Sequence, residues 1–260
     1  MSDLITVKDL EVSFKEKKKI HTVLKGVSFT LKKGEILGLA GESGCGKTTI
    51  AKAILKMVPV QSGEIVIHDK KSPQMVFQDP YGSLNPSKTI SWILEEPLKL
   101  QAAREKDDPD LPRTAQERQK KVSEMLQEVG LDDSYLIHKP TELSGGQRQR
   151  ICIGAALMQE PSILIADEPV SALDVTIQAQ VLELMKRLHE KKDLSILFIS
   201  HDLRTMYHFC DRIMVLKDGV IVEEGVPAKM YRSPKHEYTR LLLRSAGITI
   251  DHKNRGKKPV

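Results

Sequence analysis

A run of glycines near the N-terminal end of the chain could form a cradle for phosphate groups. Phosphate oxygens need many donors in a small space, and glycines let several backbone N–H groups point into one concavity. A helix that starts after such a loop adds about half a positive charge at its N-terminus. The segment fits the pattern G-x-x-x-x-G-K-[ST] and consists of Gly41, Glu42, Ser43, Gly44, Cys45, Gly46, Lys47 and Thr48.

This pattern predicts binding of a nucleoside triphosphate. We expect Lys47 to reach the β- and γ-phosphates and Thr48 to bind Mg²⁺, with Thr49 close to the nucleotide in the same first helical turn. A glycine-rich turn can meet the pattern by chance. The chance reading loses weight here because the segment follows an apolar run at residues 35–40 and precedes a helical pattern at residues 47–58.

Two adjacent carboxylates follow another apolar run. Residues 162–166 read SILIA, and Asp167 and Glu168 come next. A buried strand would hold Asp167 rigidly beside the phosphate loop, where it could bind Mg²⁺ directly or through water. Glu168 could then orient or deprotonate a water that attacks the γ-phosphate. Strands that end in surface acids are common, so this pair takes its meaning from the phosphate loop upstream.

Two further polar side chains stand at the ends of apolar runs. His201 follows residues 194–200 (LSILFIS) and could donate to the γ-phosphate, and Gln78 ends residues 73–78 (PQMVFQ) and could contact Mg²⁺ and the attacking water. An isolated His or Gln at a strand end is usually structural. Because the ends of parallel strands converge on one crevice in α/β sheets, we expect both side chains near the phosphate loop.

The elements that must position these residues alternate between strand and helix. Residues 4–14 and 20–31 alternate apolar and polar positions, which indicates half-buried, antiparallel strands. Continuous apolar strands between helices indicate a mostly parallel sheet covered on both faces. Further strands are expected at residues 35–40, 62–68, 73–78, 162–167 and 194–200, and helices at residues 47–58, 146–159 and 177–192.

The segment Leu143, Ser144, Gly145, Gly146 and Gln147 precedes one of these helices. Read locally, Ser144 and Gln147 form a capping box, and the two glycines expose backbone donors that could bind an anion. The LSGGQ sequence, placed upstream of the SILIADE strand, resembles the signature of ATP-binding cassette (ABC) proteins. In that family the signature of one protomer binds the γ-phosphate held by the phosphate loop of the other. The resemblance therefore implies ATP, Mg²⁺ and a dimer.

The resemblance covers nearly the whole chain. Gln78 matches the Q-loop of the family, Ser171-Ala172-Leu173-Asp174 the D-loop, with Asp174 at the nucleotide, and His201 the switch histidine. Phe14 is a candidate for the aromatic side chain that stacks on adenine, although a strand Phe is more often part of a core.

The family fold is an α/β P-loop NTPase core with a mostly parallel sheet, an N-terminal antiparallel β subdomain and an inserted α-helical subdomain. The resemblance implies an ABC ATPase domain at residues 1–245. The core and β subdomain take residues 1–79 and 143–232, the helical subdomain takes 80–142, and a C-terminal extension with a basic tail takes 233–260.

Finer features point within the family. The stretches VFQDPYGSLNPSKTI and DEPVSALDVTIQAQVL look like ATPase subunits of dipeptide, oligopeptide and nickel importers. SPKHEYTRLLL resembles the C-terminal H-P-Y-T stretch of that group, with Glu237 in place of the proline. Some relatives carry an iron–sulfur cysteine cluster, which this chain lacks. The resemblance implies two transmembrane permease subunits, a second ABC ATPase subunit (a sister chain or another copy), and an extracytoplasmic solute-binding protein that acts indirectly.

Composition fits this interpretation. The net charge is +5, and the excess sits largely in residues 15–19 and in the closing KNRGKKPV, which are typical of a solvated loop and a frayed tail. Three cysteines far apart suit a reducing cytosol. Neither a signal peptide nor a run of about 20 apolar residues is present. We therefore expect a peripheral protein on the cytoplasmic face of the inner membrane.

Two other classes compete with the transporter reading. Non-transport ABC ATPases that act on DNA or ribosomes usually separate the phosphate loop from the signature by coiled coils or zinc modules, or carry two cassettes. About 100 residues separate Lys47 from Leu143 here, without heptads or cysteine pairs. A P-loop kinase acting on a small molecule would leave LSGGQ without a role. The sequence thus favours an importer ATPase with no nucleic-acid partner.

Overall fold

Two β-sheets organise the chain, of which the computed structural model describes residues 2–16, 19–106 and 108–248. The smaller sheet is antiparallel, with strand order β2-β1-β4. The alternating pattern at the N-terminus explains it, because one side of each strand packs inward while the other meets solvent. The predicted antiparallel pair is confirmed. Its strands are β1 (Asp3–Glu16), β2 (Lys19–Lys32) and β4 (Ser62–Ile67).

The larger sheet has six strands in the order β5-β6-β7-β3-β8-β9. All neighbours are parallel except β8 and β9, which pair as an antiparallel hairpin. Every residue of β3, β6 and β7 is buried, which is why these strands read as unbroken apolar runs. The strands are β3 (Ile36–Ala40), β5 (Gln74–Val76), β6 (Ile163–Asp167), β7 (Ser195–Ser200), β8 (Arg212–Lys217) and β9 (Val220–Gly225).

The two faces of the larger sheet belong to two hydrophobic cores. On one face, helix α1 (Lys47–Ile54) packs between this sheet and the antiparallel sheet, through Ile50 and Ile54 among others. On the other face, alternate residues of the same strands, such as Phe198, pack against helices from the rest of the chain. The phosphate loop thus lies between two rigid supports, because β3 leads into it and α1 leads out.

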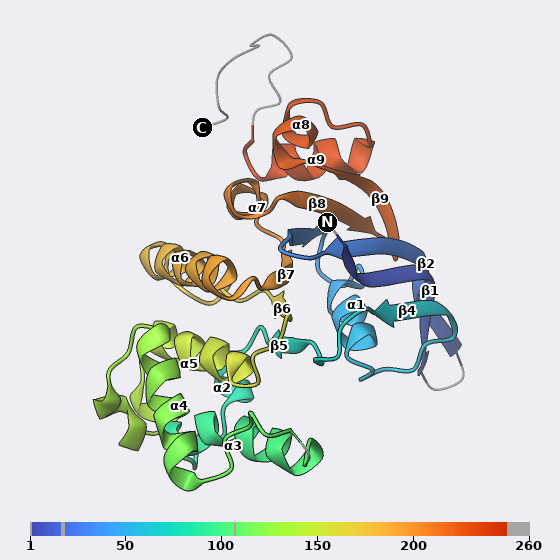
Figure 1. The fold of residues 1–260 in the computed structure, drawn as a ribbon. Helices are drawn as coiled ribbons and strands as arrows, with labels where there is room; N and C mark the ends of the chain where they lie inside the picture. Colours follow the sequence, from blue (N-terminus) through green and yellow to red (C-terminus); the bar gives the residue numbers. More distant parts are fainter. Residues whose placement is uncertain (1, 17–18, 107, 249–260) are drawn as a thin grey trace.

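Several helices lie together at one end of the molecule, drawn from blue-green through green to yellow in Figure 1. Their starts are marked by polar caps: the Thr89 hydroxyl accepts from the N–H of Trp92, and Thr114 forms a capping box with Glu117. The elements are α2 (Pro80–Ser83), α3 (Ile90–Arg104), α4 (Ala115–Glu128), the short 3₁₀ helices η1 (Asp133–Ile137) and η2 (Pro140–Glu142), and α5 (Gly145–Leu157).

The remaining helices lie beside the larger sheet, and the last two of them form the C-terminal end of the described chain (Figure 1). They are α6 (Val175–Lys192), α7 (Leu203–Phe209), α8 (Pro227–Arg232) and α9 (Glu237–Ser245). Within the described part of the chain, none of the helices has the length and apolar character to cross a bilayer. Residues 249–260, which include the predicted basic tail, lie outside the described residues, as do Lys17 and Lys18 of the basic loop.

Four predicted elements end earlier than the sequence pattern indicates, among them α5 at Leu157 rather than residue 159 and β4 at Ile67 rather than residue 68. The helix after the phosphate loop ends at Ile54 rather than at residue 58, since Lys56 has a positive φ of 57°. Strand β5 ends at Val76, so Gln78 stands two residues beyond the strand rather than at its end. Apolar periodicity carries little information about such ends, because residues just past an element still pack on the same core.

Candidate functional site

The phosphate loop turns sharply at its first and last glycines. Gly41 has a φ of 156°, and a Cβ there would lie 2.4 Å from the carbonyl oxygen of Leu216. Gly46 has a φ of 112° and caps α1, so that the helix begins at Lys47. Both positions therefore require glycine, and together they aim the first turn of α1 at the interior of the loop.

Lys47 is the cation of this loop. Its side chain is buried, and Nζ donates to the carbonyl oxygens of Gly41 at 2.8 Å and Glu42 at 2.9 Å. These two bonds hold an ammonium group inside the curve of the backbone. Since two neutral carbonyls do not balance its charge, the arrangement favours an anion in the loop.

An oxygen pair stands at the start of α1. The hydroxyl of Thr48 donates to Oδ2 of Asp167 at 2.8 Å, and Asp167 is only 3% exposed at the end of β6. Burial raises the pKa of the Asp167 carboxyl, whereas the hydrogen bond from Thr48 and the charge of Lys47 oppose that rise. Hydroxyl and carboxylate oxygens are the ligands that Mg²⁺ prefers, so this pair fits such a cation. Within the described residues, no group of three or more His, Cys, Asp or Glu side chains could hold a metal ion by itself.

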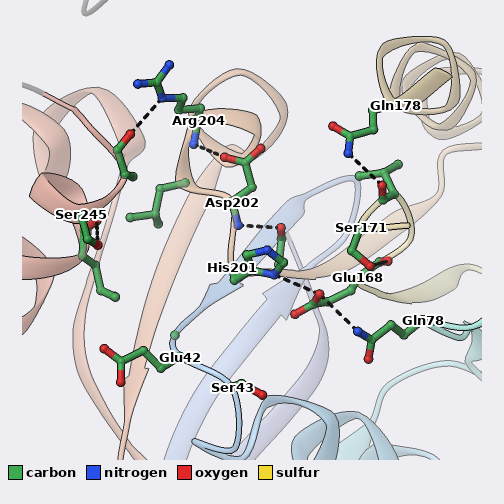
Figure 2. A pocket seen from close by; sticks show the side chains of 16 residues that line it. Glu42, Ser43, Gln78, Glu168, Ser171, Gln178, His201, Asp202, Arg204 and Ser245 are labelled. Atoms are coloured by element: carbon green, nitrogen blue, oxygen red, sulfur yellow. Dashed lines mark hydrogen bonds and ion pairs between the residues drawn. The ribbon is translucent and has the colours of Figure 1, made fainter. Parts of the chain in front are cut away.

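Glu168 is the centre of a second cluster (Figure 2). Its carboxylate oxygen Oε2 lies 3.0 Å from Nδ1 of His201 and accepts a long hydrogen bond of 3.5 Å from the amide of Gln78. Its backbone N–H donates to the carbonyl of Ile199 on β7, and its φ of 45° is in the left-handed region. An unusual backbone conformation held by a neighbouring strand aims a side chain at a fixed place, as functional sites often require.

The side chains of Glu168, His201 and Gln78 face a cavity of about 830 Å³ beside the phosphate loop. A second cavity of about 410 Å³ lies against the same loop. Glu42 and Ser43 line both, so the tip of the loop separates them. The first cavity is also lined by Gly41, Gln78, Glu168, Ser171, Gln178, His201, Asp202, Arg204 and part of α9. The second is also lined by His21, Val23, Gly44, Cys45, Lys217 and Tyr238.

The signature residues stand elsewhere on the chain. Ser144 caps α5, its hydroxyl accepting from the N–H of Gln147 at 3.3 Å, while Oε1 of Gln147 accepts from the N–H of Ser144 at 2.8 Å. The predicted capping box is therefore present. A Cβ on Gly146 would lie 2.5 Å from Cγ2 of Ile177, which explains a glycine there. Ser144, Gly145, Gly146 and Gln147 line neither of the two cavities.

Several other predicted residues also stay outside the linings of the two cavities, among them Gly46, Lys47, Thr48 and Asp167. Asp174 caps α6 by accepting from the N–H of Ile177 at 3.0 Å. Thr49 lies in the first turn of α1, half-buried. Phe14 of β1 is partly buried and packs against the core that contains α1, opposite His21 of β2. Their proposed contacts with nucleotide stay predictions.

Sequence reasoning missed several residues around the first cavity. Arg204 at the start of α7 donates to the carbonyl of Ala246 at 3.0 Å, which joins α7 to the end of α9. The amide of Gln178 donates to the carbonyls of Val170 and Leu173, which holds the turn after Glu168. A polar residue in an amphipathic helix gives no sign of such contacts, because its partners are backbone carbonyls, 5 and 8 residues away for Gln178 and 42 residues away for Arg204.

In this structure a buried parallel strand runs into a glycine loop and a helix, and a second strand ends at Asp167, next to Glu168. This arrangement defines a P-loop nucleoside triphosphatase. The family model described as "ABC transporter" matches residues 24–171. The chain therefore belongs to the ABC transporter family, and it is one of the ATP-binding, ATP-hydrolysing cassettes of that family.

Two curated relatives illustrate the match. The oligopeptide transport ATP-binding protein OppF of Streptococcus pyogenes serotype M1 is 44% identical, over 94% of this chain and 82% of its own length. The oligopeptide transport ATP-binding protein AppF of Bacillus subtilis is also 44% identical, over 86% of this chain and 70% of its own. A resemblance inferred from short motifs is thus confirmed over nearly the whole sequence.

A solved structure agrees in fold. The ATP-binding cassette MJ0796, determined as a dimer in a post-hydrolysis state with ADP and Pi, superposes with a TM-score of 0.74 at 29% identity. The match covers 86% of this chain and 98% of that one. The expected fold class, an α/β cassette with a mostly parallel sheet and an antiparallel N-terminal sheet, is confirmed.

Proposed function

We propose that this chain is the ATPase subunit of an importer for oligopeptides. The observation that carries the proposal is the cluster of Glu168, His201 and Gln78 facing a cavity at the phosphate loop, in a chain whose relatives OppF and AppF are named for oligopeptide transport. These relatives favour peptide over the nickel alternative. The cassette works at the cytoplasmic face of the membrane, beneath two permease subunits that form the path, while a solute-binding protein outside delivers the peptide.

In this proposal the loop of residues 41–48 holds the phosphates of ATP. Its backbone N–H groups and the N-terminus of α1 bind phosphate oxygens, and Lys47 leaves its two carbonyl partners to reach the β- and γ-phosphates. Phe14 stacks on the adenine. Glu168 takes the proton of the attacking water or orients it, and its contacts with His201 and Gln78 set the position of the carboxylate.

Mg²⁺ fits the oxygen pair described above. Thr48 and Asp167 would hold it, and Gln78 would approach it from the start of the helical region. When bound, the ion neutralises part of the charge on the phosphate oxygens. The chain's own residues orient the site: β6 fixes Asp167, α1 fixes Thr48, and the left-handed turn at Glu168 directs its carboxylate into the cavity.

The position of the signature supports a two-chain site. Ser144 to Gln147 sit at the start of α5 and line neither cavity beside their own phosphate loop, yet they present a helix N-terminus with two glycines. We propose that this helix start binds the γ-phosphate held by a second cassette, and that Asp174 lies at the same interface. Loss of the γ-phosphate then removes the charge that joins the two chains, which is a ligand-biased equilibrium between closed and open states.

Reconstitution with the membrane partners tests the transport proposal. The cassette, its permeases and the solute-binding protein are placed in liposomes, and ATPase activity is measured with peptide, with Ni²⁺ and with neither. We expect activation by peptide-loaded binding protein. Activation by Ni²⁺ alone, or by DNA or ribosomes added to the isolated cassette, would instead assign the chain to one of the alternative classes.

Cys45 offers a direct report of nucleotide binding, because it lies in the loop and lines the second cavity. Burial is the main cause that raises the pKa of its thiol, so alkylation should be slow at neutral pH and accelerate as the pH rises. Mg-ATP should slow it further, by about tenfold at a nucleotide concentration ten times the Kd. Mass spectrometry with N-ethylmaleimide measures the rate, and buried Cys152 and Cys210 serve as internal controls. Equal rates with and without ATP would place the nucleotide away from this loop.

A further inference from the structure

A tyrosine from the C-terminal helix contacts the phosphate loop. The hydroxyl oxygen of Tyr238, on α9, accepts a hydrogen bond of 3.2 Å from the backbone N–H of Glu42. Tyr238 is 5% exposed, and its ring lies 5.0 Å from the ammonium of Lys217. The two residues joined by this hydrogen bond are 196 positions apart in the sequence. Since the contact joins α9 to the tip that divides the two cavities, it belongs to the site.

The start of α9 is fixed so that this tyrosine reaches the loop. The carboxylate of Glu223, on β9, accepts from the backbone N–H groups of Lys235 and His236 at 2.9 Å each. The ring nitrogen Nδ1 of His236 accepts from the N–H of Tyr238 at 3.1 Å, which caps the helix. These contacts anchor α9 on the sheet, so Tyr238 approaches the loop from a rigid base.

The far end of α9 is anchored on the other side of the site. Arg204, three residues after His201, donates through Nε to the carbonyl of Ala246 and through a terminal nitrogen to that of Gly247 at 3.4 Å. Ser245 and Ala246 line the first cavity together with Glu168 and His201, as Figure 2 shows in part. Helix α9 therefore spans from the phosphate loop to the segment that carries the histidine.

Glu42 is held from two directions by side chains. Its carbonyl oxygen accepts from Lys47 and its N–H donates to Tyr238. In the proposed ATP-bound state the Lys47 ammonium turns to a phosphate group, and the Glu42 carbonyl keeps only a long bond of 3.4 Å from the N–H of Cys45, whereas the Glu42 N–H keeps the tyrosine. The tyrosine bond thus restrains the first turn of the loop when the lysine no longer does, and it matters most in the ATP-bound state.

We propose that Tyr238 is a positioning residue for the phosphate loop, holding the backbone at Glu42 in the conformation that receives the phosphates of ATP. The inference rests on the proposed ATP site at residues 41–48. Burial raises the pKa of the Tyr238 phenol, so the hydroxyl is neutral under ordinary conditions, and its removal changes a hydrogen bond rather than a charge.

Tyr238→Phe tests the proposal because it removes the hydroxyl and keeps the ring over which Lys217 lies. We expect the Kd and the KM for ATP to rise about 3- to 10-fold, the range that one lost hydrogen bond produces, with kcat changed less than about twofold. A matched control is Tyr207→Phe on α7, whose ring packs on Tyr231 and lines neither cavity. The control should bind ATP like the parent chain.

A second measurement needs no nucleotide. Hydrogen exchange of the Glu42 amide should be about 3- to 10-fold faster in Tyr238→Phe than in the parent chain and unchanged in Tyr207→Phe. Faster exchange combined with failure of the parent chain to bind ATP would remove the proposed ATP site and leave the contact as packing only. Parent-like KM and Glu42 exchange in a folded Tyr238→Phe variant would overturn the positioning role. A melting temperature that falls with no change in KM would do so as well.

Discussion

Replacing Glu168 with Gln is expected to slow ATP turnover by about 10²- to 10⁴-fold while ATP binding persists. The change keeps the size and hydrogen-bonding shape of the side chain that contacts His201 at 3.0 Å, but an amide cannot take a proton from water. A general base typically contributes a factor of about 10²–10⁴, so hydrolysis should fall by that amount. Phosphate release measures turnover, and titration with a fluorescent ATP analogue measures binding.

The matched control is Glu124→Gln on α4, an exposed acid that lines neither cavity and lies 4.0 Å from the ammonium of Lys120. It should hydrolyse ATP like the parent chain. Turnover within about threefold of the parent in Glu168→Gln would show that another group serves as the base, since the expected loss is at least about 10²-fold.

The same variant should capture the closed dimer. Because ATP is bound but not cleaved, its γ-phosphate keeps joining the phosphate loop of one chain to Ser144 and Gly146 of the other. Size-exclusion chromatography with light scattering on Glu168→Gln, with Mg-ATP and with Mg-ADP, measures this directly. A dimer of the chain alone indicates pairing with itself, whereas a dimer only after mixing with a sister cassette indicates a mixed pair. A strictly monomeric sample with every candidate cassette would remove the two-chain site.

The residues to which we assign the chemistry could be predicted because their identities are set by local requirements. Gly41 must be glycine since no Cβ fits beside Leu216, and Lys47 follows from the need for a cation at the loop. Such constraints leave a fixed spacing in the sequence. The strands that deliver Asp167 and His201 were equally evident, because burial on both faces requires unbroken apolar residues.

Contacts between distant segments could not be predicted in the same way. The hydrogen bond between the Glu42 N–H and the Tyr238 hydroxyl depends on where α9 packs. The position of α9 follows from side-chain contacts with the core of the sheet and not from any local sequence pattern. The stretch that contains Tyr238 did stand out by its resemblance to a family motif, yet nothing in it indicates a backbone N–H as its partner. The hairpin of β8 and β9 was also missed, because each strand has only six residues and a short apolar run such as that of β8 does not by itself distinguish a strand from a buried helical segment.

Replacing Lys47 with Ala is expected to weaken ATP binding by about 10- to 100-fold, the range for loss of a charge-assisted hydrogen bond to phosphate. The variant also leaves the carbonyls of Gly41 and Glu42 without the bonds of 2.8 Å and 2.9 Å that close the empty loop. It removes, in addition, a positive charge that lowers the pKa of Asp167. The lost phosphate contact and the change at Asp167 act against binding of Mg-ATP, whereas the lost carbonyl bonds destabilise the empty loop.

Lys120→Ala on α4 is the control for Lys47→Ala, since its ammonium is exposed and 4.0 Å from Glu124. It removes the same charge from the chain and should bind ATP like the parent. Titration of each variant with ATP at low and at moderate salt separates a general charge effect from a contact with phosphate. The exposed charge of Lys120 acts only through a field that salt screens, whereas Lys47 contacts the phosphate directly. If Lys47→Ala binds ATP as tightly as the parent chain, the loop of residues 41–48 is not the phosphate site. The roles assigned to Thr48, Asp167 and Glu168 would then also be wrong, because they were assigned from the position of this loop.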